Sequence, residues 1–269
     1  MSSKAKTQAA PVVAEPYKRY RDEGMHIVIG CVHVPFENKR IVEGISKLIK
    51  DCGDKIAGFH IIGDFLDMNS LSTHDMNRVP IKGVTLGLEY KRGNEILDML
   101  TEGLPAGVRK TYLYGNHEDR YFRHLNDINN NKYSDALIGP TEGLKLKARG
   151  FDVKENWKED FVQLGNKLQL IHGEFCTQTP ARTHLQRYKA SVMFAHTHRA
   201  DAHYDGNMAA FNIGWLGNKE APAFNYVSRL TKMSWINGFG IVHIDRDGFY
   251  HGQIVTAYSN RFFYNGVQY

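Results

Sequence analysis

Five short segments rich in metal-binding side chains, each placed directly after an apolar run, most strongly constrain how this chain folds. The apolar runs are typical of strands buried on both faces. In an open α/β sheet, the loops at the carboxyl ends of the strands meet in one crevice, so we expect these segments to lie together. The five segments are Cys31-Val32-His33, Gly63-Asp64-Phe65-Leu66-Asp67, Gly115-Asn116-His117-Glu118-Asp119, Ile171-His172-Gly173 and Ala195-His196-Thr197-His198.

The pattern along the chain predicts an α/β protein with two packed sheets. In the first half, strands alternate with helices; in the second half, hairpins dominate. The predicted strands are Met25–Gly30, Lys55–Gly63, Val108–Tyr114, Phe161–Leu164, Leu168–His172, Ser191–Ala195, Ala209–Ile213, Gly240–Ile244 and Phe249–Ala257. The predicted helices are Asn38–Lys50, Val84–Leu104 and Pro180–Ala190, with two or three more within Glu118–Arg149.

Composition narrows the class of protein. The 269 residues are 42% hydrophobic, which suffices for a sizeable core, and no run approaches the roughly 20 apolar residues of a membrane-spanning helix. The N-terminus lacks the apolar stretch of a secretory signal, so we predict a flexible tail over residues 1–20 and a single domain over residues 21–269. Three widely spaced cysteines favour a reducing compartment, the cytoplasm.

The formal net charge of +5 is unevenly distributed. Five basic residues and one acidic residue lie within residues 1–21, so the remaining chain is nearly neutral and lacks the charge typical of a long nucleic-acid groove. One local exception is the stretch from Phe175 to Ala200, which contains four Lys or Arg and no Asp or Glu. This stretch is either a solvated helix face or a site for phosphate groups.

The side chains in the five segments are nitrogen and oxygen ligands plus one sulfur. They suffice for two adjacent metal ions with three or four protein ligands each, which leaves open positions for water and substrate. Asp64 is placed to bridge the two ions, at a separation of about 3.5–4 Å. This pattern is typical of a catalytic metal site rather than a structural one.

In their order, C-x-H, G-D-x-x-D, G-N-H-E, H-G and A-H-T-H, the motifs resemble the calcineurin-like metallophosphoesterase superfamily, particularly its small phage and bacterial members. The usual pattern of that family is D-x-H, G-D-x-x-D/N, G-N-H-D/E, H and G-H-x-H. The resemblance implies a two-sheet αββα sandwich. It also implies a hydrolase acting on phosphoric ester bonds through a metal-bridging hydroxide.

The resemblance further implies a role for each matched residue. The first metal ion would be bound by Cys31, His33, Asp64 and His198, and the second by Asp64, Asn116, His172 and His196. His117 would be the general acid, supported by Asp67. Arg120, Arg123 and Arg199 are the candidates for binding the substrate phosphate.

Cys31 stands where the family has an aspartate. A thiolate is a softer ligand than a carboxylate and would favour Zn²⁺ or Fe over Mg²⁺. Two other interpretations are a weak or empty first site and an inert buried thiol. His33 lies two residues away on the same side of an extended segment, which favours ligation. The expected cofactors are two divalent ions drawn from Mn, Zn, Fe and Ni.

The function predicted first is hydrolysis of phosphodiesters, either nucleotides or nucleic acid. A phosphomonoesterase with the same dinuclear site is the close alternative, and a non-catalytic binding module on this fold is the second. The expected partner is a phosphate-ester substrate; no membrane partner is expected. The expected location is the cytoplasm, the host cytoplasm if the protein is phage-encoded.

The remaining histidines are predicted to be structural or surface residues, because a single histidine is more often one of these than a ligand. Four lie within predicted strands and four between them. The first group is His26, His60, His243 and His251; the second, predicted at the surface or rim, is His74, His124, His184 and His203.

Overall fold

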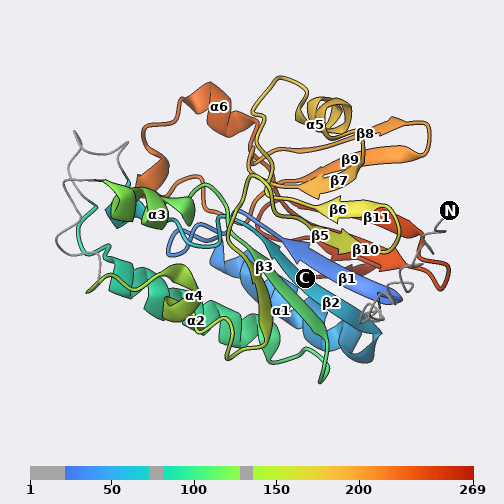
Figure 1. Cartoon of the computed structure of the whole chain (residues 1–269), viewed down its shortest axis with the longest axis horizontal. Helices are drawn as coiled ribbons and strands as arrows, with labels where there is room; N and C mark the ends of the chain where they lie inside the picture. The colour runs from blue at the N-terminus through green and yellow to red at the C-terminus, as the bar shows by residue number, and fades with distance from the viewer. Residues whose placement is uncertain (1–21, 73–80, 128–135) are drawn as a thin grey trace, which may run out of the picture.

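Two β-sheets form the centre of the computed structural model, which describes residues 22–72, 81–127 and 136–269 (Figure 1). The first sheet has six strands in the order β11-β10-β1-β2-β3-β4, and the second has five in the order β5-β6-β7-β9-β8. Strand bounds are β1 Gly24–Ile29, β2 Ile56–Ile62, β3 Arg109–Leu113, β4 Phe151–Lys154, β5 Val162–Leu164, β6 Leu168–Leu170, β7 Ser191–Phe194, β8 Ala200–Asp205, β9 Met208–Ile213, β10 Asn237–Ile244, β11 Tyr250–Ala257, β12 Phe263–Tyr264 and β13 Val267–Gln268.

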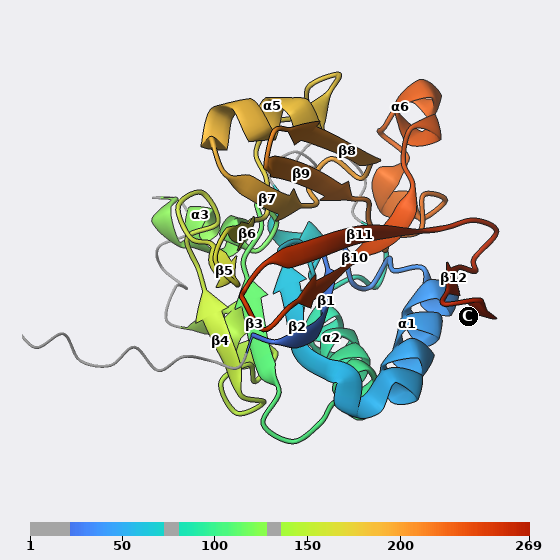
Figure 2. The ribbon, with the colours of Figure 1, turned by 90° about the vertical axis from the view of Figure 1, so that its right-hand side faces the viewer.

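The helices cover the outer faces of the two sheets. Figure 2 shows α1 and α2 below the first sheet and α5 above the second. Helix bounds are α1 Lys39–Cys52, α2 Leu86–Thr101, α3 Asp119–Asn126, α4 Pro140–Gly143, α5 Pro180–Tyr188 and α6 Arg229–Met233, with 3₁₀ turns at Gly53–Lys55, Asn69–Leu71 and Pro222–Phe224. The predicted αββα sandwich is therefore confirmed.

Successive side chains of the central strands point to opposite faces of their sheet and so pack into different layers. In β1, Ile27 and Ile29 pack against α1 and α2, whereas Val28 points into the layer between the sheets. In β7, Met193 points into that same layer, and Val192 packs under α5. Both faces of these strands are buried, which explains why they read as continuous apolar runs in the sequence.

The structure adds to the two large sheets two strands that the sequence pattern did not predict, and it adds a separate short hairpin, β12–β13. β4 follows the helical region expected over Glu118–Arg149, and β8 forms the edge of the second sheet. Both are edge strands with polar, partly exposed residues, and a strand of this kind lacks the apolar run by which the others were recognised.

Of the eight histidines outside the motifs, the four expected within strands lie there: His26 in β1, His60 in β2, His243 in β10 and His251 in β11. The prediction for His184 was wrong. Its ring is fully buried against Phe194, because α5 turns this face toward the second sheet. His74 and the tail predicted over residues 1–20 lie outside the described residues. No helix in the described part of the chain is long and apolar enough to cross a membrane.

Candidate metal centre

All five motif segments lie at the carboxyl ends of parallel strands. β1, β2 and β3 run parallel to one another in the first sheet, and β6 and β7 run parallel in the second. Their following loops therefore meet at one edge of the sandwich. Three overlapping groups of potential ligands form there, each with its ligand atoms within 4.8 Å of one another. These groups are Cys31, His33 and His198; Cys31, Asp64 and His172; and His33, Asp64 and His117.

One half of the cluster is centred on the His172 ring. Its Nδ1 lies 2.9 Å from the carbonyl oxygen of Ile62 and can only donate to it, so Nε2 carries the lone pair in the neutral ring. This Nε2 lies 3.0 Å from Asn116 Oδ1, 3.2 Å from His196 Nδ1 and 3.3 Å from Asp64 Oδ2. A lone pair thus faces two oxygen acceptors, which is unfavourable unless a cation lies among them.

The other half is centred on His33, and it repeats this arrangement. Its Nδ1 donates to the Asp67 carboxylate at 3.0 Å, which leaves the Nε2 lone pair 3.0 Å from Nε2 of His198. His198 stacks on Trp215, with ring centroids 4.5 Å apart. In both halves a hydrogen bond at one ring nitrogen aims the other nitrogen at the cluster, as is typical of metal-ligating histidines.

The spacing of these atoms fits metal coordination. Ligands about 2.1 Å from one ion, at angles of about 90–109°, lie about 3.0–3.4 Å from each other. The separations of 3.0–3.3 Å in both halves match the edges of such a polyhedron. The residues present therefore fit divalent metal ions, with Asp64 between the two halves.

Electrostatics also favour positive charge at this place. Although burial opposes ionisation, His172 and His117 hold the pKa of Asp64 well below its usual range. Burial likewise opposes the charged form of His172, but the Asp64 carboxylate raises the pKa of this ring above its usual value. A buried carboxylate that stays ionised attracts a cation, either a proton or a metal ion.

His117 lies beside the cluster with a fixed ring orientation. Its Nδ1 donates to the backbone carbonyl of Asp67 at 2.7 Å, and its Nε2 lies 4.0 Å from Asp64 Oδ2. Burial and the Arg120 guanidinium lower the pKa of His117 to about 3. The Asp67 carboxylate lies 3.6 Å from Nδ1 of His117, so Asp67 orients His33 with its side chain and His117 with its backbone.

The three candidate arginines have different environments. Arg120 is buried, with Nη1 donating to the Asp67 carbonyl at 2.9 Å and Nη2 3.4 Å from Nε2 of His117. Arg123 is exposed and donates to the Asn116 carbonyl at 2.8 Å. Arg199 donates to the Thr177 carbonyl, and its buried Nε has no hydrogen-bond partner among the described residues. Of the three, Arg120 is the one whose guanidinium contacts His117.

Cys31 is fully buried within the cluster, and its Sγ accepts a hydrogen bond from the His196 amide at 3.1 Å. Burial, reinforced by the Asp64 carboxylate, raises the pKa of the thiol well above its usual value. A metal ion would reverse this preference, because a coordinated thiol loses its proton.

Five of the seven predicted ligands have left-handed backbone conformations, which non-glycine residues rarely adopt. Their φ angles are 49° for Cys31, 55° for His33, 51° for Asp64, 57° for His196 and 61° for His198. Local strain of this kind persists where the surrounding structure imposes it, and it concentrates at functional sites. The left-handed turns bend the loops so that their side chains converge.

Glu118 is an important residue that the sequence analysis did not single out. Its buried carboxylate accepts four hydrogen bonds and so joins the loop after β2 to the loop after β3. The donors are the amides of Asp64, Leu66 and Gly115 and the hydroxyl of Tyr112, at 2.8–3.0 Å. Its place in the G-N-H-E motif was the available indication.

Close approach of these loops also requires glycine at one position. A Cβ on Gly115 would lie 2.1 Å from Asp64 Oδ1 and 2.5 Å from the Asp64 amide. Trp157, whose ring centroid lies 5.8 Å from that of His172, was also missed. Nothing in the local sequence marks this tryptophan as a neighbour of the site.

No protein-family model matches the sequence, and no curated protein matches it. Among solved structures, Vps29 from Cryptosporidium parvum is similar at 13% identity, with 91% of this chain and 94% of that chain covered and a TM-score of 0.42. Vps29 from Entamoeba histolytica complexed with Zn²⁺ has 13% identity, coverage of 86% and 98%, and a TM-score of 0.42. A predicted phosphoesterase from Streptococcus pneumoniae has 15% identity, coverage of 91% and 95%, and a TM-score of 0.38. The site is therefore interpreted from its own geometry.

Proposed function

We propose that the protein is a phosphoesterase with a dinuclear metal centre that hydrolyses phosphodiesters. The observation that carries the proposal is the convergence of histidine ring nitrogens on both sides of the buried Asp64 carboxylate. The residues that would hold the ions are Cys31, His33, Asp64 and His198 on one side and Asp64, Asn116, His172 and His196 on the other. Because Cys31 supplies sulfur, Zn²⁺ or Fe is favoured, with Mn²⁺ and Ni²⁺ as further candidates.

When bound, the two ions would lower the pKa of a water toward about 7 and offset the charge of the phosphate group. The residues of the chain provide orientation and proton transfer. Asp67 fixes the rings of His33 and His117, and Glu118 holds the two loops in register. Nε2 of His117 faces the cluster and is the atom proposed to protonate the leaving oxygen.

For this role His117 must carry a second proton, although burial and Arg120 oppose it in the free protein. Arg120 lies 3.4 Å from His117 Nε2, close enough to turn toward a substrate phosphate instead. Both the added negative charge and the loss of the arginine contact would increase the affinity of Nε2 for a proton. Arg120 would then bind the substrate and also control the proton on His117.

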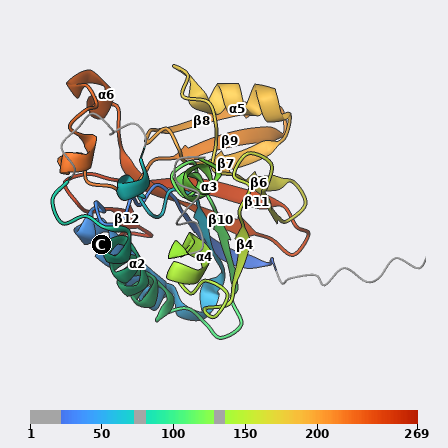
Figure 3. The same cartoon turned by 60° about the vertical axis from the view of Figure 1, so that its left-hand side comes forward.

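The rim segment, residues 214–236, supports a nucleotide-containing diester as the substrate. It is attached to the site by its backbone, since Leu216 donates to the Cys31 carbonyl at 3.0 Å and Ile236 donates to the His198 carbonyl at 2.9 Å. The helix α6 within it projects from the body (Figure 3). It carries Arg229 and Lys232 next to the exposed Leu230. Exposed Arg and Lys side chains beside a site are typical of contacts with nucleotide phosphates.

Hydrolysis assays across substrates and metals test the proposal. We would compare an aryl phosphodiester, an aryl phosphomonoester, a cyclic nucleotide and single- and double-stranded DNA, each with Zn²⁺, Mn²⁺, Fe²⁺ or Ni²⁺. We expect diester cleavage that falls about 10²–10⁴-fold in His117→Ala. His203→Ala, in the edge strand β8, is the matched control and should retain the rate.

The same assays separate the alternatives. Cleavage of the monoester alone would replace the diester proposal with a phosphatase. Bound metal without any hydrolysis would support a binding module and contradict the proposal. Cys31→Asp should shift the metal preference toward harder ions, and an unchanged preference would remove Cys31 from the ligand set.

A further inference from the structure

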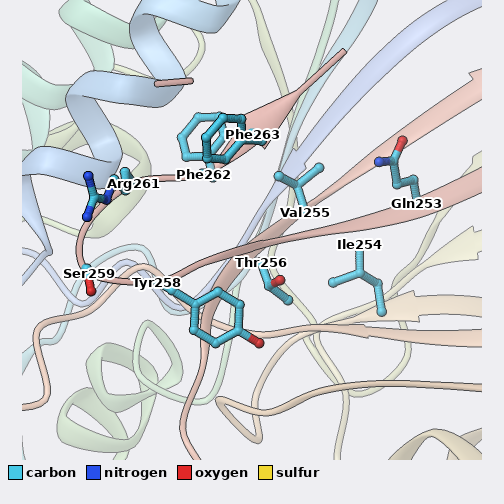
Figure 4. A pocket seen from close by; sticks show the side chains of 9 residues that line it. All are labelled: Gln253, Ile254, Val255, Thr256, Tyr258, Ser259, Arg261, Phe262 and Phe263. Carbon is cyan, nitrogen blue, oxygen red and sulfur yellow. The ribbon is translucent and has the colours of Figure 1, made fainter. Parts of the chain in front are cut away.

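Ionisable side chains that are buried without an assigned role need a physical explanation, because burial of a charged group is unfavourable unless it is compensated. The cavity of about 450 Å³ beside the end of β11 contains none of them: its ionisable residues, Tyr258 and Arg261, are exposed (Figure 4). Glu89 of α2, in contrast, is fully buried. It belongs to none of the five motif segments, so its contacts are the guide to its role.

The Glu89 carboxylate contacts the loop that follows β2, beside the candidate metal centre. Its Oε2 accepts a hydrogen bond from the Met68 amide at 2.6 Å, and its Oε1 accepts one from the Asn69 amide at 3.0 Å. These amides begin the short 3₁₀ turn Asn69–Leu71. An uncharged Ser, Thr or Asn side chain can cap the amides of such a turn without burying a charge. Capping alone therefore does not require a carboxylate at this position.

The peptide group between Asp67 and Met68 connects Glu89 to His117. Its N–H donates to the Glu89 carboxylate, while its carbonyl accepts from Nδ1 of His117 at 2.7 Å and from Nη1 of Arg120 at 2.9 Å. The N–H and C=O of a trans peptide point in opposite directions, so this group lies between Glu89 and the two side chains. A negative charge at the N–H polarises the peptide group and makes its carbonyl a stronger acceptor.

The backbone at Met68 shows that this peptide orientation has to be held in place. Met68 has φ 52° and ψ 36°, a left-handed conformation that is unfavourable for a side chain such as Met. A half-turn of the peptide plane would return φ of Met68 to negative values and turn the Asp67 carbonyl away from His117. The same half-turn would point that carbonyl oxygen at the Glu89 carboxylate, where two acceptors repel. Glu89 thus opposes the change that would relieve the strain.

We propose that Glu89 is a positioning residue, which acts through the Asp67–Met68 peptide group to fix the ring of His117 for proton transfer to the leaving oxygen. This inference rests on the proposed function for the identity of the reaction, whereas the placement of the ring can be measured without it. A stronger acceptor at Nδ1 of His117 makes Nε2 more basic. Glu89 thereby opposes the effect of burial and Arg120, which lower the pKa of His117.

Long-range proton–nitrogen NMR spectra of the metal-free protein test the placement of the ring, with the His117 signals identified by their loss in His117→Ala. Burial and the Asp67 carboxylate raise the pKa of Glu89 to about 8, so the spectra are recorded at about pH 9, where Glu89 is ionised. We expect the wild-type ring to carry its proton on Nδ1. In Glu89→Gln, the population protonated on Nε2 should rise about tenfold, the change expected for one lost hydrogen bond.

Asn94→Ala is the matched control on the same helix. Asn94 donates to the carbonyls of Tyr90 and Gly143, so its loss should destabilise the attachment of α2 without changing the His117 signals. An unchanged His117 tautomer in Glu89→Gln, or the same change in Asn94→Ala, would overturn the proposal.

Hydrolysis of two phosphodiesters with different leaving groups tests the effect on proton transfer. An alkoxide needs the proton from His117, whereas a nitrophenolate leaves without one. We expect Glu89→Gln to lower kcat for the alkyl ester about tenfold more than for the nitrophenyl ester. Glu89→Asp, which keeps the charge on a shorter side chain, should give an intermediate ratio, and Asn94→Ala should leave the ratio unchanged.

A double variant keeps this result separate from a folding defect. In the His117→Ala background, Glu89→Gln should not change the ratio of the two rates further, because both residues act on the same proton. An equal loss for both esters in Glu89→Gln would contradict a role through His117. A wild type that hydrolyses neither ester would contradict the proposed function, and the NMR spectra would still decide whether Glu89 positions the ring.

Discussion

Two groups of buried histidines place ring nitrogens about 3 Å apart, but only one group has a complete set of hydrogen bonds. In the first sheet, His60 Nε2 can donate to His26 Nδ1 at 2.9 Å, and His26 Nε2 to the Asp22 carbonyl at 2.8 Å. The Thr111 hydroxyl donates to His60 Nδ1 at 2.8 Å. Each ring nitrogen of this pair therefore has one hydrogen-bond partner, and both rings can be neutral.

The motif histidines differ because their Nδ1 donors are already used outside the cluster. His33 and His172 donate to Asp67 and to the Ile62 carbonyl, and the remaining lone pair of His172 then faces the oxygens of Asn116 and Asp64. Proximity of histidines is therefore not by itself a sign of a metal site. The distinguishing property is whether the hydrogen-bond pattern is complete without a cation.

Metal binding should produce the largest difference between the two histidine groups, measured as the free energy of unfolding. An ion that binds the folded protein alone, at about 100 times its Kd, raises the free energy of unfolding by about 2.7 kcal/mol. We expect this increase in urea unfolding of the wild type and of His26→Gln, and a smaller one in His33→Ala/His198→Ala, which keeps only the ligands around His172. Equal stabilisation of all three proteins would show that His33 and His198 do not bind the ion.

Removing the orienting carboxylate should weaken metal binding while leaving the ligands in place. Asp67→Ala frees the His33 ring to rotate, since the hydrogen bond at 3.0 Å is lost. We expect a 10–100-fold increase in the metal Kd, measured by competition with a chelating dye. Thr111→Val, which removes the matching contact at His60, is the control and should leave the Kd unchanged.

In the absence of metal, the two groups should respond differently to substitution. His60→Leu leaves Nδ1 of His26 and the hydroxyl of Thr111 without partners and should lower the free energy of unfolding by about 2 kcal/mol. His198→Asn keeps a polar side chain and accepts the left-handed backbone, so its effect in chelator should stay below about 1 kcal/mol. The reverse order in urea titrations would show that the motif histidines are the structural ones.

The smallest expected difference is in how the free energy of unfolding depends on pH. Burial lowers the pKa of His26 and, further, that of His60, so both stay neutral in the folded protein. Below pH 6.5 the unfolded chain binds these protons more readily, and stability therefore falls as the pH decreases. The loss is about 1.4 kcal/mol per pH unit for each histidine. The slope of unfolding free energy against pH should be shallower in His60→Leu, and an unchanged slope would argue against a neutral pair.

Much of the fold follows from the sequence because its central strands are buried on both faces. β1 and β2 appear as apolar runs, and α1 shows a clear amphipathic pattern. β8, with the sequence Ala-Asp-Ala-His-Tyr-Asp, has no such pattern because its residues are half-buried or exposed at an edge. Its pairing with β9 is a tertiary property that local sequence does not encode.

For the candidate site, the sequence predicts which residues come together but not how each is oriented. Parallel strands bring their following loops to one edge, and this rule is enough to gather the motifs. The sequence does not reveal that Asp67 uses both its side chain and its backbone, or that Arg120 is buried against His117. Such contacts depend on how loops from different strands bend, as with the four hydrogen bonds of Glu118.

The left-handed backbone of five ligand residues has a consequence for how the sequence changes over generations. Glycine would relieve the strain at these positions, and it would remove a ligand. Random mutation with selection for stability alone would therefore erode the site before it eroded the core. A library selected only for soluble expression should lose His33, His196 and His198 early. Their presence together in this chain is what selection for the site itself would maintain.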